Sequence, residues 1–447
     1  MEATHFESLY PDTSRAREIG EILSFVKEGN SCQMIAFPGV GRANVLGFLS
    51  YNKNIREKHL GENQKWFHFV LLNFSEIRKR PLSDAYKFIF LGIIESLRER
   101  KMSQEYEAVS KIFKEVANPN DEMVLFQGLK RTIDYLSIEK ELTVVFLFDR
   151  FEEYIPMVDS SFFANLRVLR NRAKYRFSVV FSLKRPLEDS IEPMIFSDFY
   201  EFLTGHNIYL DLTDKPSIDF RISYLEKVSG KKLDEKLKNE LLKLTSGHGK
   251  LTRLGTETIL TIDHLQLTID KLGEFLLSQK QIQGACFEIW NSLLPEEQRE
   301  ITNYDLPAGK AGLRITNEYL ENVGLIKNNA VTIPLFASFL PTMQQSSNAT
   351  ISYDPSTNEI KKGDTTISDQ LSSSEFKLLK FLIQNSNRIC EKEEIINAVW
   401  KDTKTQEGVT DQALDQIVYR LRKKIEENPN IPVHIQTIKG RGLKFTP

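Results

Sequence analysis

In the first 210 residues, short apolar runs alternate with longer amphipathic stretches. Runs rich in β-branched and aromatic residues are typical of strands buried on both faces of a sheet. Between these runs, stretches such as Asp84–Arg100 repeat apolar residues at helical spacing. This alternation predicts a parallel sheet covered by helices, an α/β domain over residues 1–213. The expected strands are Gln33–Phe37, Trp66–Phe74, Leu142–Phe148 and Phe177–Ser182.

The pattern then changes to helices without strands. Leucines recur at helical spacing around Leu237 and Leu241, and the run Ser246–Gly249 interrupts them, so we expect a small helical lid over residues 214–272. Residues 273–341 contain an amphipathic helix at Ala285–Leu294, a second one near Tyr319, and a short β-like end. Helices followed by a hairpin predict a winged helix.

A polar, uncharged segment separates this part from the last 100 residues. Thr342–Ala349 shows no periodicity, and we expect it to be a linker over residues 342–349. Residues 350–447 begin with alternating residues typical of a small antiparallel sheet. Three helices and a second hairpin follow, which predicts a second winged helix. The expected helices start near Ser372, at Lys392–Trp400 and at Thr410–Glu426.

The composition is that of an ordinary globular protein. The 447 residues are 41% hydrophobic and 27% charged, and the net charge is -2, so contact with nucleic acid requires a local basic patch. Three scattered cysteines give no disulfide framework. The apolar runs are too short to span a membrane, and the N-terminus does not resemble a secretory signal, so we expect a cytoplasmic protein with no membrane partner.

A glycine-rich turn follows the first expected strand and precedes a helix start. A phosphate-binding loop has the pattern GxxxxGK[ST], in which backbone N–H groups and a lysine hold phosphates and a hydroxyl holds Mg²⁺. Here Gly41 is kept, but Ala36 replaces the first glycine, Arg42 the lysine and Ala43 the hydroxyl residue. Arginine pairs with phosphate, whereas alanine cannot ligate a metal. We therefore expect ATP or ADP to bind without assured Mg²⁺ and predict no metal site.

The third expected strand ends in carboxylates. Asp149 follows the apolar run, and Glu152 and Glu153 come just after it, at the edge of the sheet where ligands bind in such folds. In an active ATPase, Asp149 would hold Mg²⁺ through water and Glu152 would polarise the attacking water. Nucleotide binding without turnover and an empty structural relic are the alternatives, so no catalytic residue is assigned. The expected cofactor-binding residues are Pro38, Gly39, Gly41, Arg42 and Asp149.

Residues 12–341 resemble the STAND branch of AAA+-like ATPases, signalling proteins that switch between a closed and an oligomeric form. The resemblance implies a P-loop NTPase fold with a lid and a winged helix. Besides Arg42 and Ala43, one departure is Gly249, which stands where such proteins place a proline against the adenine. The matching segments are Phe37–Gly41, Phe148–Glu153, Phe162–Arg167, Leu244–His248, Ile289–Leu293 and Tyr319–Leu325.

The third helix of the last domain carries a local basic patch. Its apolar residues Leu414, Val418, Leu421 and Ile425 form one stripe, which leaves the polar residues facing away from the stripe or flanking it. Between Tyr419 and Lys444, seven basic residues face two acidic ones, a local charge of +5. This patch predicts binding to double-stranded DNA, and a basic helix that binds protein is the alternative.

Residues 351–445 resemble the OmpR/PhoB-type winged helix of response regulators. The matching segments are Glu375–Leu379, Asn397–Trp400, Tyr419–Ile425 and Gln436–Gly442. Together with the basic patch, the resemblance defines candidate DNA contacts on the recognition helix and the wing. These candidates are Gln412, Gln416, Tyr419, Arg420, Arg422, Lys423, Thr437, Lys439 and Arg441.

The sequence therefore predicts a multidomain α/β protein that regulates transcription. Its P-loop NTPase-like module would sense a nucleotide, a small molecule or a protein, and would control a C-terminal DNA-binding winged helix. One alternative is a working ATPase of a defence or DNA-remodelling system. Another is a non-enzymatic adaptor that forms homo-oligomers.

Overall fold

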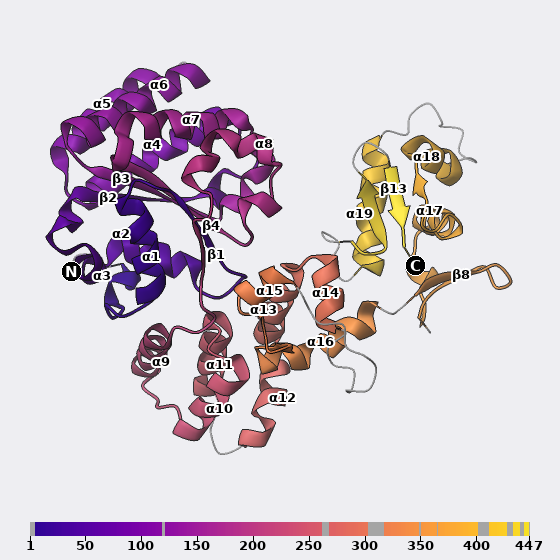
Figure 1. The fold of residues 1–447 in the computed structure, drawn as a ribbon. Coiled ribbons are helices and arrows are strands. Elements are labelled where there is room, and N and C mark those ends of the chain that lie inside the picture. Colours follow the sequence, from indigo (N-terminus) through magenta and orange to yellow (C-terminus); the bar gives the residue numbers. More distant parts are fainter. Residues whose placement is uncertain are drawn as a thin grey trace. The chain divides into compact units, whose positions relative to one another are not determined.

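The computed structural model describes residues 5–118, 121–261, 268–302, 317–347, 350–363, 365–400, 411–426, 432–438 and 442–446 (Figure 1). The chain forms two compact units, Met1–Phe339 and Leu340–Pro447, and each is described by itself. None of the helices in these ranges is long and apolar enough to cross a lipid bilayer.

A five-stranded parallel sheet forms the centre of the first unit, which confirms the predicted α/β fold. Its order is β2-β3-β4-β1-β5, so β4 lies between the strand that leads into the glycine-rich turn and the strand that ends at Asp149. The strand β5 was not predicted because it has only three residues and two of them are partly exposed. The strands are β1 (Cys32–Ile35), β2 (Phe67–Asn73), β3 (Thr143–Asp149), β4 (Phe177–Leu183) and β5 (Asn207–Tyr209).

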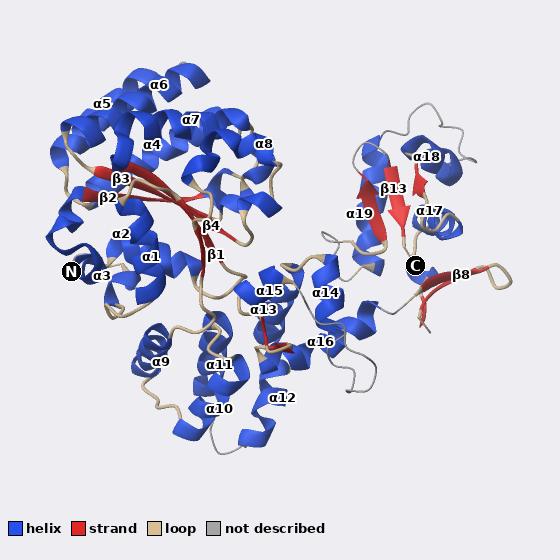
Figure 2. Ribbon diagram, viewed as in Figure 1, coloured by secondary structure: helices blue, strands red, loops and turns tan. Residues whose placement is uncertain are grey.

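Helices cover both faces of this sheet (Figures 1 and 2). One face is covered by α1 (Ala16–Lys27), α2 (Arg42–Tyr51) and α3 (Lys53–Leu60), and the other by α4 (Leu82–Glu99), α5 (Ser103–Val116), α6 (Glu122–Ile133) and α7 (Ser160–Ala173). The core on the second side is rich in phenylalanine. The ring of Phe148 lies edge-on to Phe74 at 4.7 Å and to Phe181 at 5.4 Å, a geometry that aromatic pairs favour.

Three helices form the expected lid: α9 (Lys215–Ser229), α10 (Glu235–Thr245) and α11 (Gly249–Thr261). The turn between α10 and α11 has left-handed backbone at Ser246 and Gly247, as the break in the pattern indicated. The winged-helix region then contains α12 (Leu272–Leu277), α13 (Lys280–Asn291), α14 (Pro295–Thr302), α15 (Glu318–Asn322), β6 (Ile326–Lys327) and β7 (Ala330–Val331). The domain boundaries within this unit stay predictions.

The structure differs from the sequence prediction at the expected linker. Helix α16 spans Pro334–Ser347, so residues 342–347 are helical, and residues 348–349 lie outside the described ranges. The segment lacks glycine after Pro341 and contains Met343 and Gln344, which are good helix formers. A polar composition was therefore not enough to end the helix.

The second unit begins with an antiparallel sheet of β8 (Ile351–Asp354), β9 (Glu359–Lys362) and β10 (Thr365–Thr366), as predicted. Helix α17 (Ser373–Gln384) starts with the expected cap, in which Ser372 Oγ accepts from Glu375 N–H and the Glu375 carboxylate accepts from Ser372 N–H. The remaining elements are β11 (Ile389–Cys390), α18 (Lys392–Trp400), α19 (Asp411–Ile425), β12 (Ile435–Ile438) and β13 (Gly442–Phe445).

A single apolar core joins these elements of the second unit. The stripe predicted on α19 is buried, with Leu421 and Ile425 fully covered. It packs together with Leu378 and Leu382 of α17 and with residues of the β11-β13-β12 sheet. This packing confirms the winged helix-turn-helix fold and turns the opposite face of α19 toward solvent.

Candidate functional site

The glycine-rich turn connects β1 to α2 and has a backbone that favours glycine. Gly39 and Gly41 have φ angles of 85° and 113°, in the left-handed region. A Cβ atom on Gly39 would come within 2.5 Å of His248 Cε1, so a side chain there would push the lid away. The turn therefore depends on glycine both for its own shape and for the close approach of the lid.

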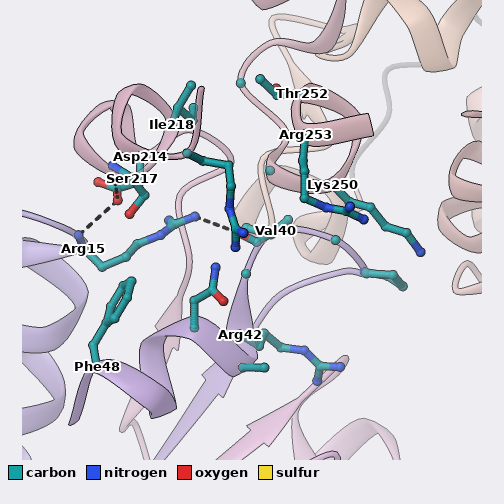
Figure 3. A pocket seen from close by; sticks show the side chains of 18 of the residues that line it. Arg15, Val40, Arg42, Phe48, Asp214, Ser217, Ile218, Lys250, Thr252 and Arg253 are labelled. Carbon is teal, nitrogen blue, oxygen red and sulfur yellow. Dashed lines mark hydrogen bonds between the residues drawn. The ribbon is translucent and has the colours of Figure 1, made fainter. Parts of the chain in front are cut away.

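A pocket of about 360 Å³ lies beside this turn. Its walls come from the N-terminal segment, the turn, the end of β3, the lid and α13, all within the first unit. In Figure 3 the apolar residues Phe48 and Ile218 lie on the same side as Arg15 and Asp214, and the basic residues Arg42, Lys250 and Arg253 lie on the other side. A pocket that combines apolar and cationic side chains is suited to an organic anion.

All predicted cofactor residues line this pocket, together with the carboxylates that follow β3. The structure therefore brings together residues that lie more than 100 positions apart in the sequence. Their role in binding stays a prediction. The lining includes Pro38, Gly39, Gly41, Arg42, Asp149, Glu152 and Glu153.

Arg42, at the position of the missing lysine, forms an ion pair with Glu152. Its two terminal nitrogens lie 2.8 Å and 3.4 Å from the two carboxylate oxygens. The side chains of Arg42 and Glu152 are only 12% and 15% exposed. Lys184, just after β4, is the second cation near Glu152, with Nζ 3.9 Å from the carboxylate. The arginine is thus already neutralised by a residue of the same chain.

Asp149 ends β3 and is almost fully buried. Burial raises the pKa of its carboxyl group, an effect that Arg42 and a hydrogen bond from Ser182 partly offset. The Ser182 hydroxyl donates to Asp149 Oδ1 over 3.2 Å. Asp149 is therefore held at the sheet edge by its neighbour on β4.

The donor atoms of the pocket do not match the Mg²⁺ site of an active ATPase. Ala43 offers no side-chain oxygen, and the carboxylate of Glu152 is occupied by Arg42. Across the ranges that the structure describes, no three His, Cys, Asp or Glu side chains gather into a metal-ligand set. We therefore derive no metal-dependent step for this pocket.

The lid binds the glycine-rich turn through hydrogen bonds to backbone carbonyl oxygens of the turn. His248 Nε2 lies 2.9 Å from the carbonyl oxygen of Pro38, and the Lys250 N–H donates to the carbonyl of Gly39 over 2.9 Å. In the sequence, His248 is no more than the last residue of the matching segment Leu244–His248. In the structure it is fully buried and stacked on Phe37.

Arg15 is a second residue that sequence reasoning missed. Its side chain is buried, and Nη2 donates to the carbonyl of Val40 over 2.8 Å, while Nη1 donates to Glu18 over 2.9 Å. Its backbone N–H donates to Asp214 at the start of α9 over 3.2 Å (Figure 3). Arg15 thus ties the N-terminal segment to the turn and to the lid. Nothing in the local pattern distinguishes it from a surface arginine.

The solvent-facing side of α19 is the candidate nucleic-acid interface. Gln416, Tyr419, Arg420 and Lys423 are exposed on it, and the Lys423 ammonium lies 4.7 Å from the centre of the Tyr419 ring. The side chain of Gln412 and the wing residues Lys439 and Arg441 lie outside the described residues. The residues of α19 that are predicted to contact DNA, as far as the structure describes their side chains, therefore share one exposed face. Arg422 is the exception.

Arg422 holds the wing rather than pointing freely into solvent. Its guanidinium donates to the carbonyl of Ile435 over 2.7 and 3.0 Å and to Thr437 Oγ1 over 2.8 Å. Burial lowers the pKa of Arg422. Two residues predicted to contact DNA, Arg422 and Thr437, thus bind each other and fix β12 against α19.

Glu426, at the end of α19, also holds the segment that leads into β12. Its buried carboxylate accepts hydrogen bonds from the backbone N–H groups of Val433, His434 and Ile435, at 2.7–3.2 Å. A carboxylate that accepts several backbone N–H bonds is a strong local anchor. No local pattern predicts this role, because Glu426 resembles any other charged residue at a helix end.

Comparison with known proteins identifies the second unit. Residues 368–445 match the family model "Transcriptional regulatory protein, C terminal". The sensory transduction protein RegX3 of Mycolicibacterium smegmatis is 43% identical over 76 residues, which are 16% of this chain and 30% of that protein. The phosphate regulon transcriptional regulatory protein PhoB of Klebsiella pneumoniae is 32% identical over 96 residues, 22% of this chain and 39% of that protein.

The chain thus spans between 30% and 39% of the length of these curated relatives. Its C-terminal domain is of the OmpR/PhoB type, as the sequence predicted. The structure of the Walker-type ATPase PABY2304 of Pyrococcus abyssi aligns with 76% of this chain and 98% of its own length, at 14% identity and a TM-score of 0.49.

Proposed function

We propose that this chain is a DNA-binding regulator of transcription, in which the N-terminal ATPase-like module controls the C-terminal winged helix. The match of residues 368–445 to the C-terminal domain of transcriptional regulatory proteins carries this proposal. In winged helices of this type, an exposed helix enters the major groove and the hairpin contacts the backbone. The protein would act in the cytoplasm, where it reaches DNA.

The exposed face of α19 has the chemistry that such binding needs. Arg420 and Lys423 supply positive charge for phosphates or base edges, and Gln416 supplies an amide that can pair with adenine. Arg422 and Glu426 hold the start of β12 beside the helix, so this part of the interface is formed before DNA arrives. Preorganisation of this kind lowers the entropic cost of binding.

For the N-terminal module we propose a nucleotide, ATP or ADP, as the ligand of the pocket. The apolar residues Tyr10, Phe48 and Ile218 would hold the base, and the turn with Arg42 would hold the phosphates. A bound nucleotide would supply contacts that bridge the turn and the lid. Such bridging contacts can bias the module between two arrangements, as a switch requires.

Two other aspects of the proposal concern partners. A homo-oligomer and a protein or small-molecule signal are both compatible with an ATPase-like switch.

A working ATPase is the less favoured function, because Ala43 and the pairing of Arg42 with Glu152 remove two parts of the catalytic arrangement.

Fluorescence anisotropy of the full chain on labelled random-sequence duplex DNA tests the main proposal. We expect binding that weakens steeply as salt rises, because phosphate contacts release counterions. Addition of ATP or ADP should shift the affinity if the module controls the domain. If the full chain does not bind DNA at low salt, and residues 340–447 alone do not bind it either, the proposed function is wrong.

A further inference from the structure

Six of the seven basic side chains that line the pocket are paired with carboxylates of the same chain, and the seventh, Arg221, lies over the rings of Phe6 and Tyr10. The pair distances are 2.8 Å for Arg42–Glu152, 3.9 Å for Lys184–Glu152, 3.6 Å for Arg150–Glu153 and 2.8 Å for Arg253–Glu257, and Lys250 pairs with Glu288. An anionic ligand therefore enters a pocket whose positive charge is largely compensated. At the six paired cations it can use that charge only by replacing a carboxylate.

The pairs Arg42–Glu152 and Arg15–Glu18 differ from the others in their burial, and the Arg15 guanidinium also donates to the carbonyl of Val40. In each of the other pairs, at least one side chain is more than a third exposed, whereas both Arg42 and Glu152 are at most 15% exposed. Water screens exposed pairs, so they contribute little, while a shielded pair interacts strongly. The state of Arg42 is therefore set mainly by Glu152.

The positions of both residues are fixed by the fold. Arg42 is the first residue of α2, directly after Gly41 of the turn. Glu152 lies in the short helical turn that follows β3, next to the fully buried ring of Phe151. The carboxylate is thus held at the mouth of the glycine-rich turn, where its two oxygens face the guanidinium in near-bidentate geometry.

We infer that Glu152 occupies on Arg42 the place of a ligand phosphate, so that a nucleotide binds this pocket by displacing Glu152 and needs no divalent metal. This inference rests on the proposed nucleotide site. A phosphate group matches the guanidinium fork in the same way as a carboxylate and carries more charge. Because Ala43 provides no metal ligand, Arg42 itself compensates the charge of the phosphate.

Lys184 makes the exchange feasible. Its ammonium already lies 3.9 Å from Glu152, and its side chain is 42% exposed and therefore able to move. When Arg42 turns to the phosphate, Glu152 keeps Lys184 as its partner, so no carboxylate is left buried without a counter-charge. The internal carboxylate then acts as a competitor that lowers nucleotide affinity and excludes ligands without a phosphate.

Equilibrium binding of ADP to the full chain tests this inference, by isothermal titration calorimetry in EDTA and again with Mg²⁺. We compare the wild type with Glu152→Gln, which keeps the shape but removes the charge, and with Glu152→Asp, whose shorter side chain reaches Arg42 less well. Glu95→Gln is the control, because Glu95 forms an exposed ion pair with Arg98 on α4. Circular dichroism and thermal unfolding check that each variant is folded.

We expect Glu152→Gln and Glu152→Asp to bind ADP about tenfold and about threefold more tightly than the wild type, with the same affinity in EDTA as in Mg²⁺. Glu95→Gln should match the wild type. Adenosine should not bind, and inorganic pyrophosphate should compete with ADP if the phosphates are recognised without the base.

Unchanged or weaker ADP binding in both Glu152 variants would overturn the inference and leave the nucleotide site intact. A strict requirement for Mg²⁺ would overturn it as well. If ADP binds none of the folded variants, including the wild type, the nucleotide proposal itself is wrong. Binding of pyrophosphate with no binding of ADP would assign the site to inorganic phosphates instead and contradict the nucleotide proposal.

Discussion

The imidazole of His248 is joined to the carbonyl oxygen of Pro38 by a hydrogen bond of 2.9 Å. The other ring nitrogen, Nδ1, accepts from the N–H of Leu251 over 3.3 Å, which assigns the proton to Nε2. A neutral histidine thus links the start of α11 to the glycine-rich turn. The lid and the α/β domain therefore share a buried hydrogen bond.

This contact predicts a pH-dependent stability of the first unit. Burial lowers the pKa of His248 to about 4, against about 6.5 in the unfolded chain. The unfolded chain binds the proton first, so stability is full above pH 6.5 and falls as the pH drops from 6.5 to 4. For this histidine the loss amounts to about 3 kcal/mol.

Denaturant titrations of His248→Gln at pH 7 and pH 4.5 measure this contribution. The variant should lose less stability than the wild type between the two pH values, because glutamine does not titrate. His68, also buried and with its pKa lowered to about 3, keeps part of the pH dependence in both proteins. The exposed His5, changed to Gln, is the control. Equal pH dependence in His248→Gln and the wild type would contradict the role of His248.

Loss of the Glu426 carboxylate should destabilise the second unit and release the start of β12. In Glu426→Ala, three backbone N–H groups, two of them buried, lose their acceptor, and the free energy of unfolding should fall by about 3 kcal/mol. Hydrogen exchange at residues 433–435 should become faster, which mass spectrometry of the peptides detects. Glu359→Ala, at an exposed carboxylate on β9, should leave exchange there as in the wild type.

The ion pair between Arg185 and Glu297 should anchor the winged-helix region of the first unit. Arg185 follows β4 and is 12% exposed, Glu297 on α14 is 2% exposed, and the Arg185 guanidinium lies 4.1 Å from the centre of the Tyr319 ring. Removing one partner of a buried pair leaves an uncompensated charge, so Arg185→Ala should cost about 3–5 kcal/mol.

Chemical denaturation and hydrogen exchange of α14 check this expectation. The double variant Arg185→Met with Glu297→Leu should be more stable than Arg185→Ala, because no charge is then left buried. Arg167→Ala breaks an exposed pair with Asp198 and should cost at most about 1 kcal/mol. A cost as small for Arg185→Ala would show that the pair does not anchor this region.

The fold was readable from the sequence because the hydrophobic pattern fixes the long elements. Val144–Phe148 is an uninterrupted apolar run, and the stripe on α19 has clear helical spacing. The short strand β5 and the helical continuation of α16 escaped prediction. Both depend on partners elsewhere in the chain or on weak propensities, which a local pattern does not contain.

The candidate sites were only partly readable for the same reason. The positions of Gly41, Arg42 and Asp149 follow from the order of strand, turn and helix. The pairing of Arg42 with Glu152, and of Arg422 with the carbonyl of Ile435, arises only when distant segments meet in space. The sequence therefore identified the chemistry of these residues but not their partners.

The most direct test of the proposed function compares DNA binding by Arg420→Ala, Lys423→Ala and Lys361→Ala with the wild type, by anisotropy over a range of salt concentrations. Arg420→Ala should weaken binding by about 1–3 kcal/mol if Arg420 contacts a base. Lys423→Ala should reduce the slope of the logarithm of the binding constant against the logarithm of the salt concentration by about 1. Lys361 lies on β9, and its loss should change neither value. Equal binding by all four proteins would contradict the assignment of α19 as the DNA-reading helix.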